Sequence, residues 1–523
     1  QRTANHTMKK RYSLYLIVVL LLIEIPFLLT GWYLFFQTNV EHVELVQKQN
    51  VFQILLPRAK QSKRTNQNKR TNQSKQTSQI SARQYRTKFE GLDFQALLAK
   101  IKGSTGQNLQ VRITHDRRTK KPRVAMNYTE LALPKMIDIS KTKEGNPSKK
   151  YAYVHYQYND QLTKNTRAFL SLCAQAGRTG RSVVKPFVKQ TKLSSDQSWF
   201  LLETYYDVKQ LDGLLAAAGY ATLVDTAEYL KECPPNSPDH VSVHFIDNSQ
   251  SSMGFTKANF HLKEDYYKAI LKNTTQKGWT ECEFLDRAMK RTPGKQFCVN
   301  GDIIKDWGIF EKDIVKNEKC LNIFIWRGID GVTYRLKFSE DSMKYSSIDL
   351  SYSLRPGQPV INEVERFTKE SLAENYIAVY VRSEFIMLSS TIDQLRKCID
   401  LMLEVVVALK ATTGLSHVYV ATDMGDNGSS SLIRLRMRRH LDENVFKLLH
   451  GQIVEKSHGV AYSPPSHVQD RGVIAFVDMT LISRAQYLIS TGSGTFQAWT
   501  SAKFLQNHRN DKQSWSKITV CEH

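Results

Sequence analysis

The sequence predicts an α/β protein built on parallel sheets, and two stretches of the chain support this prediction. In each stretch an apolar strand, a helix and a second apolar strand follow one another, the order that gives parallel pairing. The first stretch covers residues 151–188 and the second covers residues 376–422. Residues 376–381 are apolar almost throughout, as is typical of a strand that is buried on both faces. With 523 residues, the chain is long enough for two or three domains.

The N-terminal region is predicted to anchor the chain in a membrane. Residues 14–36 form an apolar stretch of about the length that crosses a bilayer. The basic cluster KKR before this stretch predicts that residues 1–13 are a cytoplasmic tail, which is type II topology with the remainder of the chain in the secretory lumen. A cleaved signal peptide is the alternative, although its apolar region is usually shorter. The run MKKRYSLYL, which begins at Met8, already resembles a natural start, so residues 1–7 need not belong to the natural protein.

A basic stem is predicted to follow the membrane span. The chain has a formal net charge of +23, which alone would suggest nucleic acid or a membrane surface as a partner. Much of this charge lies in residues 58–88, which contain no acid and repeat SKRTNQ, NKRTNQ and SKQTSQ. Such a segment has too few apolar side chains to fold, so residues 37–89 are expected to form a luminal stem. A luminal stem is a solvated spacer or binds acidic glycans, and it does not meet nucleic acid.

The cysteines and the glycosylation acceptors agree with a luminal location. The seven cysteines show no metal-ligand spacing and would form up to three disulfides with one thiol left over. Cys282 and Cys298 would close the shortest loop. Acceptor sequences for N-glycosylation occur at Asn72, Asn127, Asn273 and Asn427.

The first folded unit, residues 90–330, begins its α/β pattern with a strand at 151–158. A short NDQ turn, a helix at 162–176 and a second strand at 182–188 follow this first strand. The middle region, residues 190–330, mixes helices with a Pro-rich break after Cys233, and the sequence does not predict their order.

The second unit, residues 331–523, repeats the pattern more clearly. After the strand at 376–381, apolar residues recur at helical spacing up to residue 409, and HVYVAT forms the next strand. An amphipathic segment at 432–441 and a loop containing two prolines lead to residues 478–496, DMTLISRAQYLISTGSGTF. This last stretch is predicted to be a helix, a buried strand and a glycine loop that opens a second helix.

Three candidate functional features follow strands of this second unit. Arg382 ends the first strand, Asp423 ends HVYVAT, and the glycine loop ends the third strand. In open α/β sheets, ligands bind at the carboxyl ends of the strands, so these features are expected to share one edge. Arg382 could neutralise a diphosphate through paired hydrogen bonds, or it could form a structural ion pair. Asp423 is either a donor contact or a residue that caps its loop.

The glycine loop and the helix before it supply further candidates. Glycines free the backbone, Ser493 and Thr495 add hydroxyl donors, and a helix that begins near Thr495 offers its N-terminus to a phosphate. An ordinary turn between a strand and a helix is the alternative. Asp478 lies on an apolar helix face, where a carboxylate needs a partner. The sequence leaves two partners open for this carboxylate: the paired N–H donors of a guanine base, or a salt bridge from another element.

Several motifs that mark particular classes of enzyme are missing from the sequence. The sequence has no G-x4-G-K-S/T phosphate loop, no Asp-x-Asp pair for a metal–nucleotide complex and no serine or cysteine in a nucleophile elbow. A sugar-nucleotide enzyme built on this chain would therefore work without a metal ion or another cofactor, through arginine and helix dipoles.

Four motifs in order resemble the GDP-fucose protein O-fucosyltransferases. They are the opening YNDQLTKNTRAFLSLCAQAGRTGRSVVKPFV, then YIAVYVRSE, HVYVATD, and the run from Asp478 to Phe496. The resemblance spans about residues 150–505 and implies a GT-B fold, in which two Rossmann-like domains face each other across a cleft. It also implies a metal-independent reaction that inverts the anomeric configuration of fucose.

The resemblance implies roles for individual residues. Arg382 matches the arginine that binds the donor diphosphate and assists the departure of GDP, and Asp478 matches the acid that reads guanine. Thr495 and Phe496 match the pair that meets the nucleotide phosphates, and Asn159 matches the asparagine of the opening loop. GDP-fucose is therefore the expected donor.

The chain departs from the family pattern at three places. Tyr380 replaces the histidine of His-x-Arg, and the acid expected shortly after Arg382 is missing unless Glu384 replaces it. The opening loop lacks glycine and carries Asp160. This carboxylate would either repel a diphosphate or act as the general base that deprotonates the acceptor hydroxyl.

The expected function is therefore transfer of fucose to a Ser or Thr hydroxyl of a protein in the Golgi or endoplasmic reticulum. A small disulfide-rich extracellular repeat is a candidate acceptor. An N-glycan fucosyltransferase is the nearest alternative, and a GT-B shell that binds without turnover is the second. A Golgi sulfotransferase is a third, which lacks its expected phosphate loop.

Overall fold

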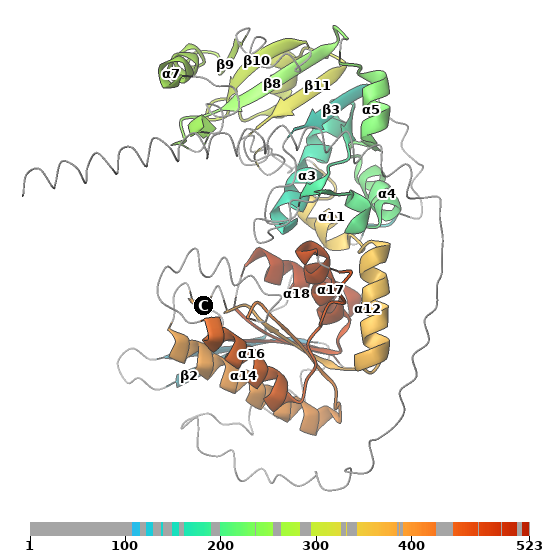
Figure 1. Cartoon of the computed structure of the whole chain (residues 1–523), viewed down its shortest axis with the longest axis vertical. Coiled ribbons are helices and arrows are strands. Elements are labelled where there is room, and N and C mark those ends of the chain that lie inside the picture. The colour runs from blue at the N-terminus through green and yellow to red at the C-terminus, as the bar shows by residue number, and fades with distance from the viewer. Residues whose placement is uncertain are drawn as a thin grey trace, which may run out of the picture. The chain divides into compact units, whose positions relative to one another are not determined.

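The structure is a computed structural model that describes two parallel-stranded sheets covered by helices (Figure 1). It describes residues 107–115, 122–128, 137–139, 149–155, 162–189, 199–235, 237–250, 252–254, 263–282, 294–325, 331, 343–383, 386–387, 391–424, 443–468, 470–492, 494–509 and 515–521. The mixed α/β class with parallel sheets that the sequence predicts is confirmed.

The first sheet has seven strands in the order β7-β4-β3-β11-β8-β10-β9, and only the β9–β10 pair is antiparallel. The strands are β3 (Lys150–Val154), β4 (Arg181–Val184), β7 (Leu223–Val224), β8 (His240–Ile246), β9 (Trp279–Glu281), β10 (Lys295–Asn300) and β11 (Cys320–Phe324). A separate pair joins β5 (Val188–Lys189) to β6 (Trp199–Phe200). The accompanying helices are α3 (Leu162–Arg178), the 3-10 turn η1 (Leu202–Thr204), α4 (Val208–Ala218), α5 (Thr226–Glu232), α7 (Glu264–Asn273), α9 (Trp307–Ile309) and the π-helical η2 (Phe310–Val315).

The predicted strand, helix and strand at the start of this unit are present as β3, α3 and β4. The second strand is shorter than predicted, because it ends at Val184 rather than at Val188. Pro186 lies just beyond this end and has no N–H to donate to a sheet ladder. The middle region, whose order the sequence did not predict, supplies the remaining strands of this sheet.

The second sheet has six strands in the order β13-β12-β14-β15-β1-β2, and only β2 runs antiparallel to its neighbour. The strands are β1 (Gln107–His115), β2 (Pro122–Tyr128), β12 (Ile377–Val381), β13 (Val418–Thr422), β14 (Tyr487–Thr491) and β15 (Ser516–Val520). The helices of this part are α11 (Ser347–Ser353), α12 (Gln358–Ser371), α14 (Ile392–Thr413), α16 (Glu443–Ser457), α17 (Arg471–Arg484) and α18 (Thr495–Asn507).

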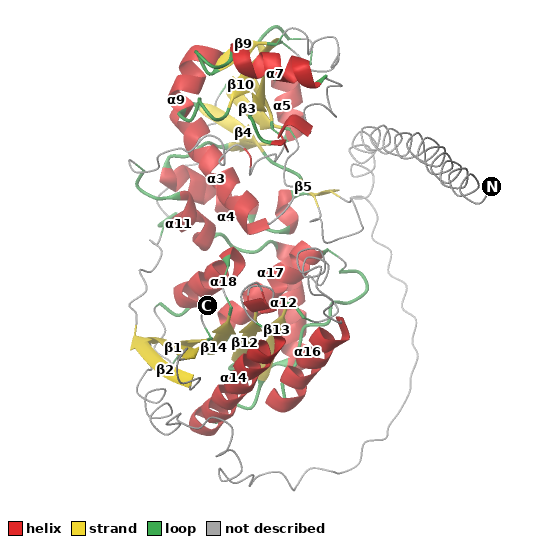
Figure 2. Ribbon diagram, turned by 90° about the vertical axis from the view of Figure 1, so that its left-hand side faces the viewer, coloured by secondary structure: helices red, strands yellow, loops and turns green. Residues whose placement is uncertain are grey.

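Strands β12, β13 and β14 are buried under helices on both faces, which explains their apolar side chains. Along β12, Ile377, Val379 and Val381 pack with α14 and α16 in one apolar cluster. Ala378 and Tyr380 point to the other face and pack in the cluster that includes α17 and α18. Figure 2 shows α14 and α16 together on one side of these strands.

Strands β1 and β2 belong to the second sheet, although the sequence places residues 90–330 in the first unit. Here the structure differs from the expectation. β1 pairs in parallel with β15, with Gln107 opposite Ser516. Without β1, the buried strand β15 would be an open sheet edge, with its backbone N–H and C=O groups unpaired. A pairing between segments about 400 residues apart leaves no local pattern in the sequence.

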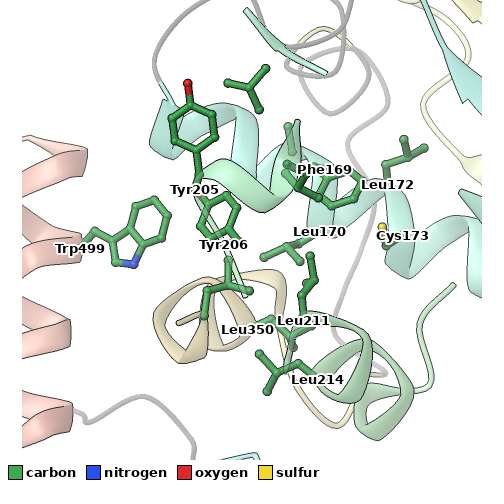
Figure 3. Close-up of a cluster of buried hydrophobic side chains, with 14 of the residues drawn as sticks. Phe169, Leu170, Leu172, Cys173, Tyr205, Tyr206, Leu211, Leu214, Leu350 and Trp499 are labelled. Atoms are coloured by element: carbon green, nitrogen blue, oxygen red, sulfur yellow. The ribbon is translucent and has the colours of Figure 1, made fainter. Parts of the chain in front are cut away.

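A continuous apolar core connects α3, α4 and α11 to α18. Figure 3 shows Trp499 of α18 pointing toward Tyr206, with Phe169 on the far side of Tyr206 and Leu350 below it in this view. The Tyr206 hydroxyl lies 2.6 Å from the Thr166 hydroxyl, so this buried aromatic ring also satisfies its polar end. Burial of these large side chains holds the helices of the two sheets together within the described residues.

Three disulfides are present, as the sequence predicts, and they join Cys233 to Cys320, Cys282 to Cys298, and Cys398 to Cys521. The expected short loop between Cys282 and Cys298 is confirmed. The remaining thiol, Cys173, is buried in α3.

The predicted tail, membrane span and stem, residues 1–89, lie outside the described residues, and so does the amphipathic segment at 432–441. Within the part of the chain that the structure describes, no helix combines the length and apolar character that crossing a bilayer requires.

Candidate functional site

The candidate site lies where the strand order of the second sheet reverses. From β12 the chain continues through α14 to β13 on one side, and it later returns to place β14 on the other side of β12. The carboxyl ends of β12 and β14 therefore flank a topological switch point, where open α/β sheets bind ligands. Arg382 follows β12 and the glycine loop follows β14, so the sequence prediction that they share an edge is confirmed.

Arg382 is held against the glycine loop by its backbone. Its amide N–H donates to the Thr491 carbonyl oxygen at 3.2 Å. Gly492 has a φ of 95° and a Cβ at that position would lie 2.7 Å from the Arg382 carbonyl oxygen. Only glycine fits both the backbone conformation and the close approach. Gly492, the first glycine of the motif, therefore fixes the backbone position of Arg382. The Arg382 side chain is half-buried.

The second glycine opens α18. Gly494 is the N-cap residue, with a φ of 120°, and no side chain caps the helix. Thr495 and Phe496 form the first turn and are half-buried. An uncapped N-terminus of a helix of 13 residues presents backbone N–H groups and partial positive charge. The expected helix start near Thr495 is confirmed.

Tyr380 connects Arg382 to this helix. Its side chain is buried, its ring centroid lies 6.3 Å from that of Phe496, and its hydroxyl hydrogen-bonds Arg382. Burial raises the pKa of Tyr380, so the hydroxyl stays neutral at physiological pH. Tyr380 therefore contacts both Arg382 and the first turn of α18.

Asp423 holds the turn after β12. Its Oδ1 accepts hydrogen bonds from the Ser383 amide at 2.8 Å and from the Ser383 hydroxyl at 2.6 Å. This geometry fits a residue that caps its loop, and a contact between Asp423 and a sugar-nucleotide donor stays a prediction. Through Ser383, Asp423 orients the residue next to Arg382.

Asp478 has a partner that the sequence did not predict. The Tyr419 hydroxyl of β13 donates a short hydrogen bond to Asp478 Oδ1. Among the described residues, no lysine or arginine forms a salt bridge with Asp478. Burial raises the pKa of the Asp478 carboxyl from 3.8 to about 7, and the Tyr419 hydrogen bond lowers it in part. The carboxyl is therefore close to half-ionised at neutral pH.

A signal for Tyr419 was present in the sequence. In HVYVAT the side chains alternate, so Tyr419 and Ala421 face away from Val418 and Val420. A tyrosine that is buried in a strand needs a partner for its hydroxyl, and Asp478 was the unpaired acid of a neighbouring helix. Ser383 carried no comparable signal.

Other predicted residues are placed as follows. Asn159, Asp160, Glu384, Asn427, Ser493 and Asn72 lie outside the described residues. Asn273 is exposed at the end of α7, and Asn127 lies in β2. Within the described ranges, no three His, Cys, Asp or Glu side chains cluster as metal ligands would. A metal-independent reaction stays a prediction.

Comparison with known proteins gave matches among solved structures alone. No family model and no curated protein matches the chain. POFUT1 in complex with GDP-fucose matches with 12% identity and a TM-score of 0.43, covering 73% of this chain and all of that one. The fucosyltransferase NodZ from Bradyrhizobium matches with 11% identity and a TM-score of 0.31, covering 68% of this chain and 93% of that one. Both of these solved structures are fucosyltransferases.

Proposed function

We propose that the chain transfers fucose from GDP-fucose to an acceptor hydroxyl, with the donor bound at the switch point of the second sheet. The observation that carries the proposal is the position of Arg382, a half-buried cation beside the uncapped N-terminus of α18. A diphosphate placed there would receive charge-assisted hydrogen bonds from the guanidinium and backbone N–H groups from the helix. Both groups stabilise the negative charge that develops as GDP leaves.

Asp478 is proposed to read the guanine base. Guanine presents two neighbouring N–H donors, and an ionised carboxylate accepts both. Tyr419 hydrogen-bonds Oδ1 of Asp478, and the described residues place no further hydrogen bond on this side chain. Oδ2 can therefore accept from the base, and the Tyr419 hydroxyl fixes the orientation of the carboxyl.

The finer steps follow from the family resemblance. The reaction inverts the anomeric centre, because the acceptor oxygen attacks from the side opposite to GDP. It needs a base for the acceptor proton, and Asp160 of the opening loop is the proposed base. The acceptor is a Ser or Thr hydroxyl of a secretory-pathway protein. No metal ion is required, since Arg382 and α18 supply the positive charge.

The proposed setting is the lumen of the Golgi or endoplasmic reticulum, with residues 14–36 as a type II anchor. The two α/β units would form the GT-B arrangement, with a boundary near residue 330 except for β1 and β2. Three disulfides support this setting, because disulfides persist in oxidising compartments.

Calorimetric titration of the full chain with GDP-fucose, in the presence of a metal chelator, tests the donor site. Arg382→Ala should remove saturable binding and transfer, because the diphosphate loses its charge-assisted bonds. Arg396→Ala is the matched control, since Arg396 is exposed on α14 and pairs only with Asp393 of the same helix among the described residues. Binding that persists unchanged in Arg382→Ala would contradict the assigned role.

A second candidate is a protein that binds the sugar nucleotide without turnover. It is favoured by the opening loop, which lacks glycine and carries Asp160, and by Tyr380, which stands where the family motif has a histidine. The same titration separates the two candidates when GDP release is measured in parallel. Saturable binding without GDP release in the presence of secretory-pathway acceptors would favour the second.

A further inference from the structure

A second charged site lies away from the switch point, at the C-terminal ends of α17 and α18. It is a pocket of about 650 Å³, and its lining includes the last turns of these two helices and the first turns of α4 and α12. Asn507 lies twelve positions after Thr495 in α18, about 18 Å along the helix axis. The pocket therefore lies at the other end of α18 from the proposed diphosphate position, although Met479 and Thr480, which follow Asp478 in α17, contribute to its lining. A pocket of this volume holds a small molecule.

Positive charge dominates the lining. Lys209, Arg355, Arg484 and Lys503 face two acids, Glu203 and Asp207. Both acids already have partners: Glu203 pairs with Lys185 at 2.9 Å, and Asp207 accepts the Gln210 amide as the N-cap of α4. By contrast, within the described residues Lys209, Arg355 and Arg484 form no ion pair.

Lys503 is the most informative of these cations. It is 9% exposed, and its ammonium donates to the Leu354 carbonyl oxygen. An ammonium group carries three N–H donors, and the Leu354 carbonyl oxygen is the one acceptor that the Lys503 ammonium meets among the described residues. Burial lowers the pKa of Lys503 to about 7, and the like charge of Arg355 adds to the effect. A buried cation beside a second cation lacks a counterion.

Two helix N-termini and two helix C-termini meet at the pocket, so its positive potential comes mainly from the side-chain cations. The N-terminus of α12, with 14 residues, has no side-chain cap at Gly357, and α4 also starts at the pocket. These ends carry partial positive charge. The C-terminus of α17 carries partial negative charge, but two of its carbonyl oxygens already have hydrogen-bond partners. The Asn507 side chain donates to the Ser483 carbonyl oxygen at 2.9 Å, and a ring nitrogen of His508 lies 2.7 Å from the Ala485 carbonyl oxygen.

We propose that this pocket binds a small molecule with a multiply charged phosphate group, held by Lys503, Arg355 and Arg484. The guanidinium groups supply paired donors to phosphate oxygens, and Lys503 supplies the counter-charge from the buried wall. Leu354, Pro356 and Met479 line the remainder and would contact the apolar part of the ligand.

The probe for the test is inorganic pyrophosphate, titrated into the full chain by calorimetry near pH 7. The double variant Arg355→Gln and Arg484→Gln should weaken binding at least tenfold, and both residues are exposed, so the fold should persist. Arg382→Gln should leave pyrophosphate binding in the Lys503 pocket unchanged. The same variant should abolish any pyrophosphate binding at the switch point. Equal affinity in the double variant and the unchanged chain would overturn the proposal.

A spectroscopic readout distinguishes ligand binding from a merely structural lysine. In protein labelled at lysine Cε, pyrophosphate should raise the pKa of Lys503 by at least one unit, because the anion favours the charged form. Lys410 of α14 is the control, since burial also lowers its pKa but it lies outside this pocket. No change at Lys503 with saturating pyrophosphate would overturn the proposal. Loss of GDP-fucose binding in Arg382→Ala tests the donor site separately, so either proposal can fail alone.

Discussion

At the scale of the residue, the electrostatics of the candidate site depend on Asp478. Among the described residues, its hydrogen-bond partner is the Tyr419 hydroxyl rather than a cation, and burial raises its pKa to about 7. A protonated carboxyl keeps one carbonyl oxygen as an acceptor and carries a donor on the other oxygen, so only the ionised form accepts hydrogen bonds on both oxygens. The hydrogen-bonding capacity of the site is therefore expected to change as the pH passes through about 7.

Donor affinity should rise with pH through about 7. Guanine offers two donors, so it favours the ionised carboxylate, and the protonated form must lose its proton before it binds both. At pH 6 we expect GDP to bind about tenfold more weakly than at pH 8, since each pH unit below the pKa costs about a factor of ten. Calorimetric titration at several pH values measures the effect.

Asp478→Asn provides the control for this prediction. The amide does not ionise, so the variant should bind GDP weakly at every pH between 5.5 and 8. A pH profile of the unchanged chain that is flat over this range would contradict both the raised pKa and the role of Asp478 in reading the base.

At the scale of the element, the glycine loop positions Arg382. The parallel pairing of β12 with β14 brings Val381 opposite Thr491, and the two chains continue side by side into Arg382 and Gly492. The absence of a side chain at Gly492 permits the contact, and Gly494 begins α18 without a cap. The cation and the helix N-terminus are thus fixed by the same short loop.

Gly492→Ala should lower both stability and donor binding. The added Cβ would be strained at a φ of 95° and would lie 2.7 Å from the Arg382 carbonyl oxygen, so Arg382 must shift. We expect the free energy of unfolding to fall by about 1–3 kcal/mol. Denaturant unfolding and GDP-fucose titration measure the two effects.

Gly414→Ala is the matched control, because Gly414 ends α14 at a φ of 75° and has open space around its Cβ position. This variant should lose about 1 kcal/mol through backbone strain and keep its donor affinity. If both glycine variants bind GDP-fucose like the unchanged chain, Gly492 does not position Arg382.

At the scale of the whole molecule, a disulfide and long-range strand pairing join distant segments of the chain in and around the second sheet. Cys398 of α14 is joined to Cys521, which follows β15, across 123 residues of sequence. The pair lies in the apolar cluster under α14 and α16. This bond therefore ties the end of the chain to the helix that covers its sheet.

Removal of this disulfide should cost more stability than removal of the short one. The Cys398–Cys521 loop is closed over 123 residues and the Cys282–Cys298 loop over 16. Loop-closure entropy predicts that the double variant Cys398→Ser and Cys521→Ser loses about 2 kcal/mol more than Cys282→Ser and Cys298→Ser. Denaturant unfolding of both variants gives the difference, and equal losses would contradict the entropic account.

The sequence by itself determined the features that depend on local pattern. The apolar runs and helical spacing predicted β12, α14 and β13, because burial on both faces forces apolar residues into adjacent positions. The position of Arg382 and of the glycine loop at strand ends followed directly, and so did the short disulfide loop. The same local pattern predicted the anomaly of Asp478, a carboxyl on an apolar helix face.

The tertiary structure alone decided which partners these residues meet. Tyr419 reaches Asp478 across 59 residues, and β1 pairs with β15 across about 400 residues. The pocket with Lys503 combines the ends of α17 and α18 with the starts of α4 and α12. Hydrophobic burial, which drives these long-range contacts, is non-directional, so no single stretch of sequence encodes which distant segment it will cover.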